Sequence, residues 1–128
     1  MSGVEKARES LKSARILFEA ECYDSCASRC YYAMFQMAVA ALIKLGIQQP
    51  SRRERYSHDW VQATVSRELI HRRKILPAHM ANALPNALEL RIRADYRENQ
   101  LSRKPAERML KKCEEFMNCL HQEVFANG

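Results

Sequence analysis

The feature that most constrains this chain is a segment, residues 22–43, that is apolar on almost every side when it is arranged as a helix. A helix of this kind normally lies at the centre of its fold. Its polar side chains share one narrow face at about 100° per residue: Ser25, Arg29, Tyr32 and Gln36. A charged group on a central helix must reach water, a partner or a ligand, because an unpaired buried charge is very costly. Arg29 and Tyr32 therefore require an explanation.

Composition favours helices over sheets, and one domain over several. Glycine (3) and proline (4) are scarce, whereas alanine, leucine, glutamate, lysine, arginine and methionine are plentiful. The length of 128 residues suits a single domain over residues 1–128. The longest apolar run, residues 33–43, is shorter than the roughly 20 residues of a membrane span, and the N-terminus has no signal pattern. We therefore expect a cytoplasmic protein that does not enter a membrane.

Apolar periodicity predicts five helices. We expect them to cover about residues 4–21, 23–46, 57–73, 78–97 and 105–124. Ser2 and Ser57 suit the N-caps of the first and third helices, and Gly46 suits a left-handed C-cap after the second. Pro85 interrupts the fourth pattern, where we expect a kink or a break. Five helices joined by short loops indicate an all-α fold, an antiparallel up-and-down helical bundle.

Five cysteines in a chain without a signal pattern indicate free thiols. Cys22, Cys26 and Cys30 recur every fourth residue and roughly share one helix face. A metal site there is conceivable, but zinc motifs usually place closely spaced ligands at turns. Cysteine is also a small residue that is often buried. We therefore expect core packing, with no metal and no cofactor.

The net charge of +6 is concentrated in two blocks. Residues 51–75 hold seven basic against three acidic side chains, and residues 91–112 hold eight against three. Two such blocks are what a polyanion-binding protein needs. An ordinary solvated surface explains the same composition, so charge alone leaves both interpretations open.

A second polar set lies on the predicted fourth helix, where Arg91 and Asp95 continue the face of an apolar stripe and Tyr96 follows them. In one interpretation these residues form a structural network, with Asp95 paired to Arg29 or Arg91. In the other, Arg29 and Arg91 surround a cleft for a phosphate or phosphodiester, since the guanidinium fork matches phosphate oxygens, and Tyr32 adds a hydroxyl and a stacking surface. Both interpretations can hold at once.

His58 stands at the expected start of the third helix, beside the basic loop. Histidine is the side chain best suited to general acid–base chemistry near neutral pH. The tripeptide Ser57-His58-Asp59 is equally typical of a simple helix start. No Gly-rich phosphate loop or serine-nucleophile motif accompanies it. His58 is therefore a candidate acid–base residue, with a structural role as the alternative.

Several segments, taken in order, resemble the HEPN domain in its small stand-alone prokaryotic branch: residues 14–20, residues 23–35 with Arg29-Cys30-Tyr31-Tyr32-Ala33-Met34-Phe35, the pair Ser57-His58, and Arg91-Ile92-Arg93-Ala94-Asp95-Tyr96. The resemblance spans nearly the whole chain. It implies an up-and-down helical bundle that forms a homodimer. Many family members are metal-independent RNases, often toxins encoded with a nucleotidyltransferase antitoxin, and others bind nucleotides or act as scaffolds.

The RNase members of that family place an arginine, four to six further residues and then a histidine at a dimer cleft, where the RNA 2′-hydroxyl attacks its adjacent phosphate. Arg91 matches the arginine, but no histidine follows it before His121. The resemblance therefore implies Arg91 as a catalytic residue. His58 would replace the missing histidine, and Tyr96 is the weaker substitute because a phenol titrates far from neutrality.

Two functions follow as hypotheses. The first is an RNA- or nucleotide-interacting protein, extending to the toxin RNase of a HEPN–nucleotidyltransferase pair, with a phosphate site formed by Arg29, Tyr32, Arg91 and Asp95. The second is a non-catalytic helical dimer that binds a partner protein such as a nucleotidyltransferase, in which the polar residues only stabilise the bundle. The missing histidine favours the second.

Overall fold

The described part of the chain, residues 2–50 and 56–126 of a computed structural model, is built from helices and contains no strand. The long α-helices are α1 (Gly3–Glu19), α2 (Tyr23–Lys44), α4 (Ala83–Tyr96) and α5 (Arg103–Leu120). Shorter segments complete the fold: α3 (His58–Thr64), which continues as the π-helix η1 (Val65–Arg72), the 3₁₀ turn η2 (Ala78–Met80), and the π-helix η3 (His121–Phe125), which extends α5.

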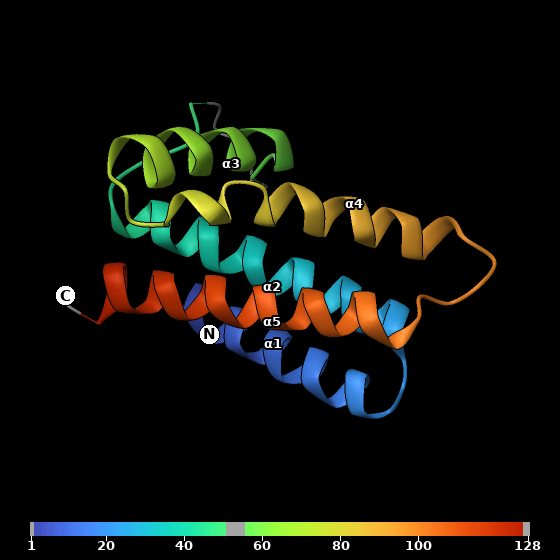
Figure 1. The fold of residues 1–128 in the computed structure, drawn as a ribbon. Coiled ribbons are helices and arrows are strands. Elements are labelled where there is room, and N and C mark those ends of the chain that lie inside the picture. The colour runs from blue at the N-terminus through green and yellow to red at the C-terminus, as the bar shows by residue number, and fades with distance from the viewer. Residues whose placement is uncertain (1, 51–55, 127–128) are drawn as a thin grey trace.

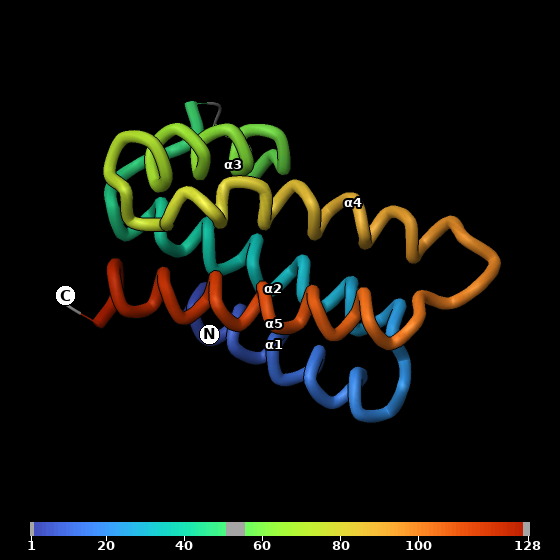
Figure 2. The backbone as a smooth tube through the Cα atoms, viewed as in Figure 1, coloured from blue at the N-terminus to red at the C-terminus, as the bar shows by residue number. Residues whose placement is uncertain are grey.

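Helix α2 runs through the middle of the bundle, with α1 and α5 on one side and α3 and α4 on the other (Figure 1). It packs against all four of these helices. The backbone trace in Figure 2 shows the chain reversing direction between α1 and α2 and again between α4 and α5. The predicted all-α, up-and-down helical bundle is therefore confirmed.

Local sequence signals set several of the helix ends. The backbone N–H of Glu5 donates to the Ser2 hydroxyl at 3.1 Å, which caps α1. The N–H of Trp60 donates to the Ser57 hydroxyl at 3.4 Å, which caps α3. Gly46 has a φ of 77°, a left-handed conformation that glycine adopts without strain just after α2. All three predicted helix-end residues are confirmed.

The fourth predicted helix is divided differently from the expectation. Residues 78–97 do not form one helix with a break at Pro85, because η2 ends first and α4 begins only at Ala83. Pro85 therefore lies in the first turn of α4, where its missing N–H removes no hydrogen bond and its ring fixes a helical φ. The prediction of a kink or break at Pro85 is wrong, since the break precedes the proline.

Aromatic and sulfur-containing side chains fill the core around α2. Tyr31, Met34 and Met37 of α2 are at most 1% exposed, and Phe116 of α5 is fully buried. By length and composition alone α2 could also cross a membrane, but 56% of its most apolar stretch is buried inside the bundle. An apolar surface on all sides is what the central helix of a bundle requires.

The described cysteines divide between the core and the surface. Cys26, Cys30 and Cys113 are fully buried, and the Cys113 thiol donates to the backbone carbonyl of Cys30 at 3.5 Å. Hydrogen bonding between these thiols, followed by burial, raises the pKa of Cys26 and of Cys30 above the ordinary value and keeps both protonated. Cys22 is exposed and does not join them. The expected packing role therefore fits the buried thiols and not Cys22.

Overpacking tests the central position of α2. Ala38 is fully buried in this helix, so we expect Ala38→Leu to lower the free energy of unfolding by about 1–3 kcal/mol. Ala63→Leu is the matched control, because Ala63 is exposed on α3 and the change there should stay within about 0.5 kcal/mol. Urea unfolding followed by circular dichroism measures both. Equal effects would contradict the assignment of α2 as the core helix.

Candidate functional site

Arg91 on α4 lies against two aromatic rings of α2. Its guanidinium carbon is 4.8 Å from the centroid of the Tyr32 ring and 5.8 Å from that of Tyr31. The guanidinium carbon of Arg29 is 5.0 Å from the same Tyr32 centroid. A cation over a ring face is attracted by the ring quadrupole. Tyr32 therefore holds two positive charges close to one point of the molecule.

Arg91 is only loosely paired with a carboxylate. Its Nε lies 3.9 Å from Oδ2 of Asp95, one turn further along α4, which is too long for a hydrogen bond. This buried Nε makes no hydrogen bond with any residue that the structure describes. Asp95 therefore pairs with Arg91, as the interpretation of these residues as a structural network predicts. The loose pairing leaves the rest of the guanidinium, whose side chain is 25% exposed, available to a phosphate.

His58, the first residue of α3, packs into the same region. Its ring stacks on Phe35 with a centroid separation of 4.5 Å and on Tyr31 with one of 5.5 Å, and its Nδ1 shares a hydrogen bond with the Tyr31 hydroxyl. Burial, reinforced by the charge of Arg91, lowers the pKa of His58, against a smaller opposing effect of Asp59. His58 is therefore neutral near pH 7, in the form that can accept a proton.

Tyr31 supports this histidine from the core. Its side chain is fully buried, and burial raises the pKa of its hydroxyl to about 12, so the hydroxyl keeps its proton at neutral pH. The hydroxyl donates to Nδ1 of His58 or accepts from it, according to which ring nitrogen carries the proton. When Nδ1 carries the proton, Nε2 is the acceptor that remains. The pair can thus orient the imidazole for proton transfer through Nε2.

The structure brings most of the predicted site residues into one group, which we call the Arg91 cluster: Arg29, Tyr31, Tyr32, His58, Arg91 and Asp95. Tyr96 does not join it. This last residue of α4 is 84% exposed, and its side chain makes no hydrogen bond or ring contact with a described residue. The geometry of a single chain therefore gives the predicted catalytic role of Tyr96 no support.

A groove of about 670 Å³ opens beside the Arg91 cluster, and both Tyr32 and His58 line it. Much of its wall is apolar and comes from Val4, Phe35, Val39, Ile43 and Phe125. Gln36, the last polar residue on the α2 face, also lines the groove, but its side-chain amide is hydrogen-bonded to Ser10 of α1 at 2.8 Å. The cluster therefore borders a mainly apolar groove.

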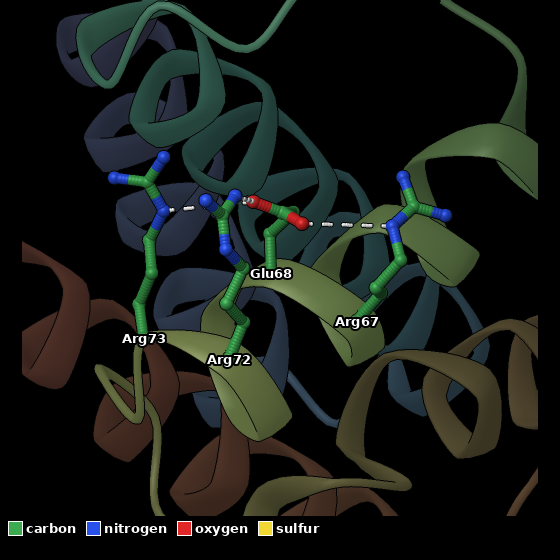
Figure 3. A network of polar contacts seen from close by, with 4 residues as sticks. All are labelled: Arg67, Glu68, Arg72 and Arg73. Atoms are coloured by element: carbon green, nitrogen blue, oxygen red, sulfur yellow. Dashed lines mark hydrogen bonds and ion pairs between the residues drawn. The ribbon is translucent and has the colours of Figure 1, made fainter.

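One carboxylate organises the described part of the first basic block (Figure 3). The side chain of Glu68 is only 11% exposed, and three guanidinium nitrogens surround it: Arg72 at 2.7 Å, and Arg67 and Arg73 at 3.6 Å each. The hydrogen bond from Arg72, with the positive charges of all three arginines, lowers the pKa of Glu68. Positive charge remains in excess at η1. Lys74 of this block is exposed, and Arg52, Arg53 and Arg55 lie outside the described residues.

Comparison with known proteins assigns the family. A family model described as the HEPN domain matches residues 3–124. The chain belongs to the HEPN domain family. This HEPN chain is similar to the UPF0332 protein glr0978 of Gloeobacter violaceus, with 33% identity over 93 residues that cover 73% of the chain and 68% of that protein. Family membership supports a nucleotide- or RNA-related function for the chain.

Sequence reasoning did not assign a role to two aromatic residues of this HEPN domain. Tyr31 and Phe35 lie in the apolar segment, where core packing is the natural prediction, and Tyr31 is indeed fully buried. Only the fold shows that both rings stack on His58. The available signal is their i, i+4 spacing, which places both rings on one side of the helix, facing the same neighbour.

The Glu68 network makes stability depend on pH. A carboxylate whose pKa is lowered in the folded state stabilises folding above its unfolded pKa, here 4.5, and this contribution is lost as pH falls through the folded value. We therefore expect Glu68→Gln to be less stable than wild type at neutral pH, with the difference shrinking below pH 4.5. Thermal unfolding across this range measures it, with Glu9→Gln on the exposed face of α1 as control. A difference that does not change with pH would contradict this explanation.

Proposed function

We propose that this HEPN protein binds RNA or a nucleotide, with a phosphate group held at the Arg91 cluster. The observation that carries the proposal is the environment of the Arg91 guanidinium. It lies against two tyrosine rings, and its carboxylate neighbour, Asp95, is too far away for a hydrogen bond. The Arg91 side chain is 25% exposed, so donors that do not face Asp95 are open to a ligand. A phosphate accepts two such N–H bonds at once in the fork geometry of arginine.

The surroundings of Arg91 favour an anion. Arg29 brings a second positive charge to the same Tyr32 ring and forms no ion pair with a described residue. The tyrosine rings exclude water from one side of each guanidinium, and charges interact more strongly where water is excluded. Tyr32 also lines the adjacent groove, where a ribose or base attached to the phosphate would lie.

The proposal extends to RNA cleavage, as in a cytoplasmic toxin encoded with a nucleotidyltransferase antitoxin. Cleavage needs an acid–base group as well as an anion site, and neutral His58 is the group that the cluster offers. The 2′-hydroxyl would give its proton to His58 while its oxygen bonds to the phosphorus. The bond from phosphorus to the 5′-oxygen would break, and that oxygen would take a proton from the resulting imidazolium. Arg91 would stabilise the charge on the phosphate oxygens.

Fluorescence anisotropy with a labelled single-stranded RNA, at fixed salt concentration, tests binding. We expect Arg91→Ala to raise the dissociation constant about ten- to a hundredfold, because a hydrogen bond to a charged group contributes about 1.5–3 kcal/mol. Arg15→Ala is the control, because it removes the same charge from an exposed ion pair with Glu114 on the α1–α5 side of the bundle. Equal affinity of wild type and a folded Arg91→Ala protein would refute the site.

Denaturing gels of the same samples separate binding from cleavage. We expect wild type to cut the RNA and His58→Asn to bind it without cutting, since asparagine retains a polar side chain but cannot transfer a proton near neutral pH. Intact RNA in the presence of bound wild-type protein would exclude the RNase role and leave the binding proposal standing.

A second candidate, a non-catalytic dimer that binds a protein, is supported by the apolar groove. Ile43 lines the groove and is 54% exposed, and exposed apolar surface in a groove is typical of protein contacts. In this proposal a second copy of the chain covers the groove, and a nucleotidyltransferase binds the homodimer. The lack of a histidine between Arg91 and His121 favours it, because the RNase motif of the family is then incomplete.

Light scattering coupled to size exclusion tests this second candidate. We expect Ile43→Glu to shift wild-type dimers to monomers, because the change places a charge in the covered groove. Ile16→Glu is the matched control, since Ile16 is an equally prominent isoleucine, 59% exposed, on α1 outside the groove. A wild-type monomer, or equal effects of the two changes, would contradict a homodimer formed through this groove.

A further inference from the structure

A second groove, separate from the Arg91 cluster, lies between α4 and α5. Its volume is about 360 Å³, and it shares no lining residue with the groove beside Tyr32. We propose that this α4–α5 groove binds a small organic phosphate of mononucleotide size, with the phosphate on a basic rim and the organic part on an apolar floor. The inference goes beyond the proposed function, because no member of the Arg91 cluster lines this groove.

The rim carries positive charge that its surroundings do not neutralise. Besides His79, whose Nε2 lies 2.7 Å from a carboxylate oxygen of Glu115, three basic side chains line the groove: Arg93 on α4, and Arg108 and Lys112 on α5. None of the three forms an ion pair or a side-chain hydrogen bond with a described residue. Two neighbours on α5, Arg103 and Lys111, are instead both paired with Glu107, at 3.6 and 3.5 Å. Helix α5 therefore pairs these two cations with a carboxylate, whereas Arg108 and Lys112 form no ion pair with a described residue.

The spacing of these cations is unfavourable without an anion. Arg108 and Lys112 lie one turn apart on α5, and like charges at this spacing destabilise a helix. Arg93 adds a third positive charge from α4, and Glu89 is the one carboxylate among the lining residues described. A phosphate offers several acceptor oxygens and negative charge to all three cations at once. Binding of a phosphate would therefore relieve the repulsion among these three cations.

The floor of the groove suits the organic part of such a ligand. Met34, Ala87 and Met109 line it and are at most 6% exposed, so they form a continuous part of the bundle core. Asn82, the N-cap residue of α4, and Asn86, in the first turns of that helix, add amide groups that make no side-chain hydrogen bond with a described residue. Methionine packs well against flat rings, and amides can pair with a polar ring edge. The volume lies within the roughly 300–1,000 Å³ of small-ligand pockets.

Calorimetric titration with adenosine monophosphate, adenosine and inorganic phosphate tests the inference. We expect the monophosphate to bind more tightly than either part, because it alone uses both the rim and the floor. Arg108→Ala and Lys112→Ala should each weaken its binding about tenfold. Lys111→Ala is the matched control, since its charge lies next to Lys112 in sequence but is paired with Glu107. In an Arg91→Ala background, monophosphate binding should still be detected and should still weaken on Lys112→Ala, because Arg91 does not line this groove.

Several results would overturn the inference. No binding of the monophosphate to the wild-type protein at millimolar concentration would do so, as would equal binding of phosphate and monophosphate. Loss of binding in Arg91→Ala with none in Lys112→Ala would place the ligand at the Arg91 cluster. RNA affinity, measured separately on the same variants, distinguishes failure of this inference from failure of the proposed function. The two α5 positions are exposed, so circular dichroism should show both variants folded.

Discussion

The contact between the Arg91 guanidinium and the tyrosine rings of α2 joins the core of this bundle to its surface. Helix α2 has to be apolar because other helices cover it on several sides. The rings of Tyr31 and Tyr32 pack as apolar groups. The Tyr31 hydroxyl can still form a hydrogen bond, and both rings can still bind a cation through their π-electrons. Packing α3 and α4 against this one helix brings the imidazole of His58 and the guanidinium of Arg91 to the same pair of tyrosines.

The distribution of carboxylates decides which cations are free to bind a ligand. Glu68 collects three arginines at η1, and Glu107 pairs with two cations on α5, whereas Asp95 approaches Arg91 only at 3.9 Å. Arg91 and Arg93 are two positions apart on α4, roughly 200° around the helix axis. One therefore lies against the rings of α2, and the other lines the groove beside α5. Helix α4 thus contributes one positive charge to each of two candidate sites.

Features that depend on local sequence could be predicted, and features that depend on packing could not. The caps at Ser2 and Ser57 follow from side-chain chemistry within one helical turn. The break before α4 was not predicted. In the sequence, Pro85 interrupts the apolar pattern in the same way whether it lies in the first turn of a helix or in its interior. Arg91 stood out as a charge following an apolar stripe. Tyr31 did not, because its role depends on the packing of α3 over α2, between residues far apart in sequence.

The most direct test of the account is an NMR titration that follows the Nε–H groups of the arginines while a short oligoribonucleotide is added. The account predicts that the Arg91 Nε–H resonance, assigned by its loss in Arg91→Lys, shifts in a saturable way as a phosphate binds the other donors of the same guanidinium, those that do not face Asp95. The resonance of Arg15, which is paired with Glu114, should not move. Saturable RNA binding with an unmoved Arg91 resonance would contradict the claim that this guanidinium holds the phosphate.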